Sequence, residues 1–291
     1  MLVLLMLMFG GVSLASFFGF LIAQFILDVP LLTNPALAED LSNPSLLPVL
    51  RLLQILQALG LLILPSLGFL YLSSSQKGLG VFTNPIRQRI MLSIVLFMVA
   101  MPFINFIADW NTHLTLPEPF GTWATQKETQ AEKLIERFLQ MPHLGWLAFN
   151  LFMIALLPAI GEELLFRGVV QRLVTQWSGN AHVAVWTAAI LFSAIHMQFL
   201  GFVPRLFMGA ALGYLFLWSG NLWYPMVAHF ANNAMAVVIV YMQQHGSSQT
   251  TLDTTGIQNP AMAAFSLAFC LIIMYLFQAV QEKKDSLAVG G

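Results

Sequence analysis

The sequence contains few charged residues and almost no cysteine. Charged side chains make up 9% of the 291 residues, whereas a soluble domain has about 25%. This scarcity excludes an ordinary soluble domain, and the formal net charge of −1 excludes a general electrostatic affinity for nucleic acid. The chain has one cysteine, Cys270, so neither a disulfide nor a cysteine metal cluster can form within it.

Long apolar runs take the place of the missing charges. Hydrophobic residues make up 58% of the chain, and a bilayer core of about 30 Å needs roughly 20 apolar residues in a helix. The first run has no basic stretch before it and no small-residue cleavage site, so we interpret it as a retained span, not a signal peptide. The sequence therefore predicts an all-α polytopic membrane protein with about eight transmembrane helices. We expect them at residues 1–27, 52–73, 90–107, 144–161, 183–202, the two halves of 206–251 on either side of SGN (219–221), and 260–280.

The placement of lysine and arginine predicts the orientation, because cytoplasmic loops of membrane proteins are enriched in these residues. Seven basic residues fall on one side of the membrane if both termini are cytoplasmic, and the loop at 250–260 on the other side has none. We therefore expect an integral protein of a bacterial inner (plasma) membrane with both termini in the cytoplasm. The seven residues are Lys77, Arg87, Arg89, Arg167, Arg172, Lys283 and Lys284.

The long segment 109–143 contains a second kind of helix. Within TWATQKETQAEKLIERFLQM (122–141), apolar residues recur at helical spacing between charged ones. This pattern predicts an amphipathic helix that lies on the membrane surface. The apolar positions are Ala131, Leu134, Ile135, Phe138 and Leu139.

GEELLFRG, residues 161–168, carries three charges directly after an uncharged apolar run. Glu163 and Arg167 are four residues apart and share one helix face, with the glutamate in the favourable N-terminal position. Glu162 is rotated from Glu163 by about 100°, so it points elsewhere. The alternative is a helix end at which all three charges are solvated, but the apolar GVVQRLV that follows argues against it.

Two further polar clusters lie in later spans. FSAIH (192–196) places Phe192 and His196 one helical turn apart, and HFANN (229–233) does the same for His229 and Asn233. Each cluster alone is also explained by hydrogen bonding between helices. Ionisable residues inside spans are costly, however, and by default mark a functional site. The other histidines are expected in solvent, in loops or near span ends: His113, His143, His182 and His245.

Together the three clusters fit polar hydrolysis in a membrane. A carboxylate can take a proton from water, histidines can ligate a metal or stabilise an oxyanion, and an asparagine amide can donate to that oxyanion. In a plain zigzag, His196 late in the fifth span and His229 early in the seventh lie near opposite sides of the membrane. They can meet only near mid-depth, or where a helix is bent or re-entrant.

The three motifs also carry a resemblance to a known family. EELLFR matches the pattern EExxxR, FSAIH matches FxxxH and HFANN matches HxxxN, in that order and on separate helices. Residues 144–242 thus resemble the CPBP family of intramembrane proteases, which includes the CAAX-prenyl endopeptidases and bacteriocin-processing or self-immunity proteins. Patterns of other intramembrane proteases are absent: there is no HExxH, no GxSxG, and no aspartate between residues 144 and 242.

The resemblance implies a role for each motif residue. Glu162 would be the general base that activates water, and Asn233 would stabilise the tetrahedral intermediate. His196 and His229 would bind a zinc ion or hold the water and the oxyanion directly. Glu163 and Arg167 would be supporting residues. If a metal is bound, its expected ligands are His196, His229 and Glu162.

The resemblance also suggests an organisation within one integral membrane domain. It divides the chain into N-terminal spans with the surface helix (1–143), a CPBP-like catalytic core (144–243), and a last span with a cytoplasmic tail (244–291). The expected partners are membrane lipid and a peptide or protein substrate, such as a lipidated or bacteriocin-like one. Two alternatives stay open. A non-catalytic immunity, scaffold or peptide-binding protein would keep the same fold, and a transporter would also bury such residues but should show repeated halves, which the sequence lacks.

Overall fold

The computed structural model describes residues 2–30, 34, 43, 45–73, 81–246 and 259–289. Every regular element in these ranges is a helix, which confirms the predicted all-α class. The elements are α1 (Leu2–Phe25), α2 (Leu46–Gln57), η2 (Ala58–Ile63), α3 (Leu64–Leu72), α4 (Arg87–Thr112), α5 (Phe120–Phe138), α6 (Leu144–Asn150), η3 (Leu151–Leu156), α7 (Leu157–Glu163), η4 (Leu164–Gln171), α8 (Arg172–Ser178), α9 (Ala181–Ala194), η5 (Phe199–Gly201), α10 (Phe202–Ser219), α11 (Trp223–Gln244) and α12 (Pro260–Val289).

Within the described ranges, seven helices are long and apolar enough to cross a membrane. Several of them combine consecutive elements, such as α2, η2 and α3. The seven are Leu2–Phe25, Leu46–Leu72, Arg87–Thr112, Leu144–Ser178, Phe199–Ser219, Trp223–Gln244 and Pro260–Val280, and the shorter apolar helix Ala181–Ala194 adds to them. The predicted polytopic membrane architecture is therefore confirmed.

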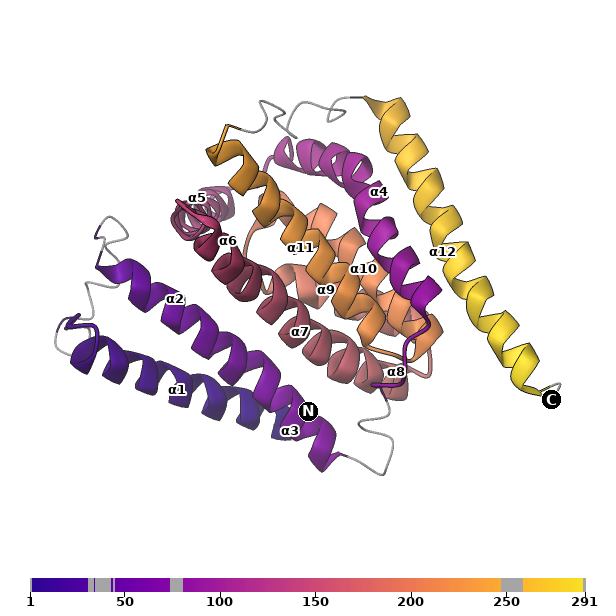
Figure 1. Cartoon of the computed structure of the whole chain (residues 1–291), viewed down its shortest axis with the longest axis horizontal. Coiled ribbons are helices and arrows are strands. Elements are labelled where there is room, and N and C mark those ends of the chain that lie inside the picture. The colour runs from indigo at the N-terminus through magenta and orange to yellow at the C-terminus, as the bar shows by residue number, and fades with distance from the viewer. Residues whose placement is uncertain are drawn as a thin grey trace.

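The fifth predicted span, 183–202, differs from expectation. Its helix, α9, has only 14 residues and is followed by a turn and by η5. The helix cannot continue because Met197 has a φ of +55°, a left-handed conformation. α9 still packs against α8 before it and α10 after it. The start of α1 and the end of α12 lie toward the same end of the bundle (Figure 1).

The fourth predicted span is longer than expected. The sequence predicts a helix over 144–161, whereas α6 to α8 form a continuous helix, Leu144–Ser178, of 35 residues. GEELLFRG therefore lies in the middle of a helix and not where a helix leaves the membrane. The segments η3 and η4 are π-helical, a form that appears frequently at functional sites.

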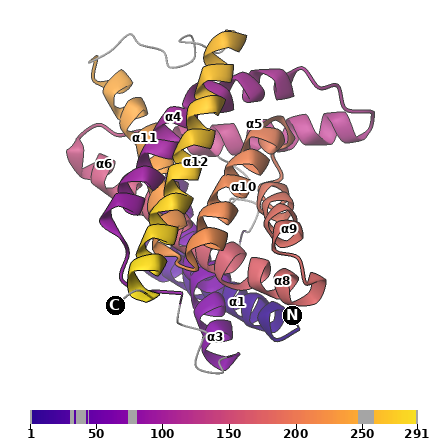
Figure 2. The same ribbon diagram turned by 90° about the vertical axis from the view of Figure 1, so that its right-hand side faces the viewer.

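The predicted amphipathic helix is present as α5, which lies across one end of the bundle (Figure 2). Its C-terminal end is fixed to two spans. The Phe138 carbonyl accepts hydrogen bonds from Arg51 Nη2 at 3.4 Å and from Asn150 Nδ2 at 2.7 Å. The last carbonyls of a helix have no partner within it, so these bonds satisfy the end of α5 and hold it against α2 and α6.

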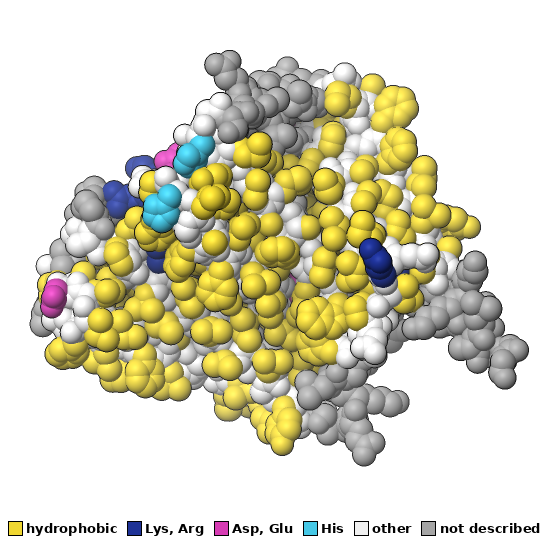
Figure 3. All heavy atoms as spheres, in the orientation of Figure 1, with side chains coloured by type: hydrophobic (Ala, Val, Ile, Leu, Met, Phe, Trp, Pro, Cys, Tyr) yellow, Lys and Arg dark blue, Asp and Glu magenta, His cyan; other side chains and the backbone are white. Residues whose placement is uncertain are grey.

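The outer surface is mostly apolar, with few charged side chains on the face shown in Figure 3. Large side chains such as Phe9, Phe25 and Tyr275 are 76%, 75% and 71% exposed. Contiguous apolar surface of this extent marks contact with a membrane or a partner. Arg89, used above to orient the chain, is buried. Its Nε donates to the Phe277 carbonyl at 2.9 Å, which ties α4 to α12.

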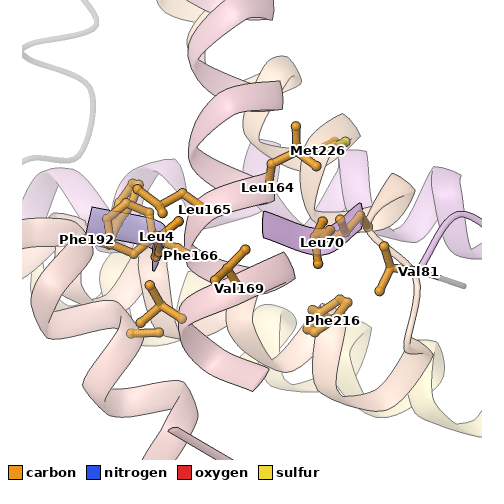
Figure 4. Packing of buried hydrophobic residues seen from close by; sticks show 13 residues of the cluster. Leu4, Leu70, Val81, Leu164, Leu165, Phe166, Val169, Phe192, Phe216 and Met226 are labelled. Atoms are coloured by element: carbon orange, nitrogen blue, oxygen red, sulfur yellow. The ribbon is translucent and has the colours of Figure 1, made fainter. Parts of the chain in front are cut away.

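The side chains around η4 form the largest described apolar cluster (Figure 4). Six elements contribute to it, from the first helix to the eleventh. Because lipid is as apolar as these side chains, such contacts hold helices together mainly through close packing. Members labelled in Figure 4 are Leu4, Leu70, Val81, Leu164, Leu165, Phe166, Val169, Phe192, Phe216 and Met226.

The first two membrane helices touch backbone to backbone. A Cβ atom at Gly11 of α1 would collide with the Gly60 carbonyl oxygen in η2, and a Cβ at Gly60 would lie 2.5 Å from the Gly11 oxygen. In contrast, a Cβ at Gly10 would meet nothing within 4 Å. Small residues allow this kind of close approach between membrane helices.

This pair of neighbouring glycines gives a matched test. Gly11→Ala should lower the midpoint of thermal unfolding in detergent, because overpacking costs about 1–3 kcal/mol. Gly10→Ala should leave the midpoint unchanged or raise it, since alanine is favoured over glycine in a helix by about 1 kcal/mol. Equal midpoints for the two variants would contradict this contact between α1 and η2.

Candidate active site

Glu163 and Arg167 form a buried ion pair, as their spacing predicted. Arg167 Nη1 lies 2.9 Å from Glu163 Oε1, and both side chains are 0% exposed. The alternative of solvated charges at a helix end is therefore wrong for these two residues. Arg167 Nη2 also donates to the Gly209 carbonyl of α10 at 2.7 Å. The pair thus joins the long central helix to α10.

His229 of α11 is held by the same carboxylate. Its Nδ1 lies 2.8 Å from Glu163 Oε1. A carboxylate paired with arginine only accepts hydrogen bonds, so Nδ1 carries the proton and donates it. In the neutral ring, Nε2 then keeps its lone pair. Glu163 therefore fixes both the orientation and the tautomer of His229. The sequence prediction paired Glu163 with Arg167 but missed this bond.

Glu162 faces the other nitrogen of the same imidazole. Its Oε2 lies 3.7 Å from His229 Nε2, and its side chain is 12% exposed. This separation is too long for a direct hydrogen bond. Among the described residues, the buried Oε2 atom has no hydrogen-bond partner. Glu162 is therefore the more accessible of the two glutamates and retains an unused acceptor beside His229.

His196 lies in the turn after α9, two residues beyond its last residue Ala194, and the Phe192 ring lies close to both His196 and His229. The Phe192 ring centroid lies 5.1 Å from that of His196 and 5.8 Å from that of His229. His196 Nδ1 is 2.8 Å from the Phe192 carbonyl oxygen. Because a carbonyl oxygen only accepts, Nδ1 donates, and Nε2 of the neutral ring is again the free acceptor. Both histidines thus lie against the same phenylalanine ring, although the sequence placed them near opposite ends of two spans.

Asn233 lies on α11, one turn beyond His229, and is partly buried. Its Oδ1 accepts a hydrogen bond from Asn232 Nδ2 at 3.2 Å, which leaves the Asn233 amide nitrogen as a donor. Among the described hydrogen bonds, none joins Asn233 to the glutamates or the histidines. The structure therefore joins Glu163, Arg167 and His229 by hydrogen bonds and places Glu162 3.7 Å from His229. His196 contacts Phe192, and Asn233 lies on the same helix as His229.

α10 approaches the charged helix at two glycines. Arg167 Nη2 donates to the Gly209 carbonyl, and one turn further along both helices Gln171 Nε2 donates to the Gly213 carbonyl at 3.0 Å. A Cβ at Gly213 would lie 3.2 Å from Gln171 Oε1 of the charged helix and 2.9 Å from Val185 Cγ1 of α9, so glycine allows α10 to approach both helices closely. The sequence analysis missed these two contacts, although small residues four apart, as in GAALG, are typical of close helix packing.

The side chains of His196, His229 and Glu162 have the donor chemistry that zinc prefers. Catalytic zinc takes three protein ligands of the histidine and carboxylate kind. Within the described part of the chain, no group of three or more His, Cys, Asp or Glu side chains is placed to hold a metal. The expected set of His196, His229 and Glu162 therefore stays a prediction.

The buried ion pair predicts a stability effect for Glu163. Glu163→Gln should lower the free energy of unfolding by about 3–5 kcal/mol, because it leaves the Arg167 charge buried and unpaired. Combining it with Arg167→Met should recover part of this loss. Thermal unfolding of purified protein measures both effects, with exposed Glu132→Gln on α5 as the control. A double variant less stable than Glu163→Gln alone would contradict the pairing.

Comparison with known proteins agrees with the three motifs. Residues 144–235 match the family model described as type II CAAX prenyl endopeptidase Rce1-like. Over 90 residues, the chain is 36% identical to the uncharacterized protein YpbD of Bacillus subtilis (strain 168), a match that covers 30% of this chain and 43% of that protein. No solved structure matches the chain. The matched segment, residues 144–235, contains all six predicted site residues, and over it the resemblance to the CAAX-type membrane protease family is confirmed.

Proposed function

We propose that this protein is an intramembrane endopeptidase that hydrolyses a peptide bond with a water molecule activated by Glu162. The observation that carries the proposal is the arrangement of Glu162 Oε2 opposite His229 Nε2, 3.7 Å apart, while Glu163 holds the other side of the imidazole. Both facing atoms are acceptors. A water molecule between them can donate one hydrogen to each, which raises the electron density on its oxygen.

The reaction follows from these positions. The water oxygen attacks the carbonyl carbon of the substrate as Glu162 takes one of its protons. The tetrahedral intermediate then collapses, the bond between carbon and nitrogen breaks, and the proton passes to the leaving amine. The products are a carboxylic acid and an amine, so atoms and protons balance. Glu163 and Arg167 keep His229 in place without reacting themselves.

His196 and Asn233 complete the proposed machinery. The resemblance implies that His196 and His229 hold the water and the oxyanion. In His196, Nδ1 is occupied by its hydrogen bond to the Phe192 carbonyl, so only Nε2 can take part. Neutral His196 offers an acceptor at Nε2, so it suits water or a proton. The Asn233 amide nitrogen is then the side-chain donor for the oxyanion.

The family match and the apolar surroundings of the site support a class of substrate. The matched family model is described as a prenyl endopeptidase, and the site lies between apolar helices that face lipid. We propose a peptide or protein substrate that reaches the site from the membrane, such as a lipidated or bacteriocin-like chain. We also propose a bacterial inner membrane location.

The central test is Glu162→Gln. This change should lower kcat for cleavage of a peptide library by about 10²–10⁴-fold, because it removes the general base. The midpoint of thermal unfolding should stay near that of the parent protein, since Glu162 makes no direct ion pair. Exposed Glu136→Gln on α5 is the matched control and should keep full activity. A parallel arm with a chelator and added zinc tests whether a metal takes part.

The outcomes separate the rival readings. If Glu162→Gln retains parental turnover, the proposed mechanism is wrong. If Glu162→Gln is active while Glu163→Gln is folded and inactive, the roles of the two glutamates are reversed. If the parent protein binds peptides and cleaves none, the non-catalytic binding protein is the correct alternative.

Orientation gives a second prediction. With both termini in the cytoplasm, a reporter fused after Gly291 should be active in the cytoplasm. A reporter inserted at Gly121 in α5 should be active on the other side, because α5 connects the end of the third membrane helix to the start of the fourth. The same readout at both positions would contradict an even number of membrane passes.

A further inference from the structure

The connection between α9 and α10 carries His196, and its backbone is strained. We call residues 195–201 the α9–α10 turn. Met197, directly after His196, has a φ of +55°. A residue other than glycine in this conformation costs about 1–3 kcal/mol and persists only where the surrounding structure over-determines it. The contacts that hold this turn therefore also determine where the His196 ring lies.

The first contact comes from the end of α4. Asn111 is 1% exposed, and its Nδ2 donates to the Phe199 carbonyl at 2.8 Å. Its Oδ1 accepts a hydrogen bond from Val203 N at 3.2 Å. Asn111 thus binds the C-terminal half of the turn and the first residues of α10, but does not reach the residues nearest His196.

Gln198 holds the half of the turn next to His196. Its side-chain Nε2 donates to Glu128 Oε1 of α5 at 3.3 Å. Its Oε1 accepts from Arg205 Nη2 at 2.9 Å, and its backbone carbonyl accepts from Arg205 Nη1 at 3.0 Å. Gln198 is therefore the point where the surface helix, the turn and α10 meet.

Aromatic contacts also join the α9–α10 turn to α5. The Phe199 ring centroid lies 4.7 Å from that of Phe120 and 5.5 Å from that of Trp123, both on α5. Because the other end of α5 is fixed at Phe138, the helix is anchored at both ends. It can therefore act as a firm support for the turn.

Glu128 is partly buried in this network. Burial raises the pKa of its carboxyl group, while the nearby charge of Arg205 acts in the opposite direction. The hydrogen bond from Gln198 needs only an oxygen acceptor on this side chain. Glu128→Gln keeps such an oxygen, whereas Glu128→Ala removes it.

We propose that Gln198 is a positioning residue for His196, acting through Glu128 of the surface helix and Arg205 of α10. The proposal rests on the proposed function, since it takes His196 as part of the reacting site. The amphipathic helix then has a task beyond lying at the membrane surface, because it supports the turn that presents the imidazole. Neither Gln198 nor Glu128 belongs to the three sequence motifs.

The test uses the full-length protein in lipid nanodiscs. Gln198→Ala should increase hydrogen–deuterium exchange of the amides in the α9–α10 turn, and it should lower kcat roughly 10- to 100-fold. A displacement of about 1 Å can cost about 10²-fold in rate. KM should stay within about twofold, because Gln198 acts on His196 and not on the substrate. Exposed Gln126→Ala on α5 is the control and should change neither quantity.

Glu128 supplies the conservative comparison. Glu128→Ala should lower kcat as Gln198→Ala does, and Glu128→Gln should recover most of it. The double variant Gln198→Ala with Glu128→Ala should be no slower than the slower single variant, because both changes break the same bond. If the losses of kcat in the two single variants multiply in the double variant, the two residues do not act through one shared hydrogen bond, and the proposal is wrong.

The two readouts keep this proposal separable from the proposed function. If hydrogen–deuterium exchange in the α9–α10 turn is unchanged in Gln198→Ala, Gln198 does not hold the turn and the proposal is wrong, whatever the activity. Increased exchange with parental kcat shows that the tie holds the turn without positioning a reacting group, which also overturns the proposal. A raised KM with unchanged kcat assigns Gln198 to substrate binding instead. If Glu162→Gln keeps parental turnover, the proposed function fails and the assignment to catalysis fails with it, while exchange still reports on the tie.

Discussion

The buried ion pair between Glu163 and Arg167 is the constraint on which the site depends. Two charges buried at membrane depth are costly unless they pair and gain further contacts. Three helices supply such contacts: the Gly209 carbonyl of α10 accepts from the guanidinium, His229 of α11 donates to the carboxylate, and the Phe192 ring centroid of α9 lies 5.0 Å from the guanidinium carbon. The contacts that stabilise this ion pair therefore hold α9, α10 and α11 around one point of the long helix Leu144–Ser178.

The same constraint gives two adjacent glutamates different surroundings. Glu163 is fully buried and shared between a cation and an imidazole. Glu162, rotated about 100° on the helix, remains partly exposed and keeps an unused oxygen. One carboxylate is thus enclosed between charged and polar partners, and the other remains partly accessible. Because Glu163 holds His229 by Nδ1, the Nε2 acceptor of the ring faces Glu162.

Sequence reasoning succeeded where local spacing decides the outcome. Apolar runs predicted the long helices, apolar residues at helical spacing predicted α5, and the interval of four predicted the contact between Glu163 and Arg167. It missed the bond from His229 to Glu163, because the rotation of one membrane helix against another depends on packing along both. The end of α9 was also missed. Methionine rarely adopts the left-handed conformation, so the sequence gives no sign that Met197 does. The roles of the six site residues stay predictions.

The short α9 has a consequence for the lipid beside it. A helix of 14 residues is about 21 Å long, whereas the hydrocarbon core of a bilayer is about 30 Å thick. Lipid next to the outward side chains of α9, such as Trp186 and Ile190, therefore has less apolar length to match than lipid beside α4 or α12. A bilayer responds to such a mismatch by thinning locally. The thinner hydrocarbon on this side brings the two water interfaces closer together beside α9 than beside the longer helices.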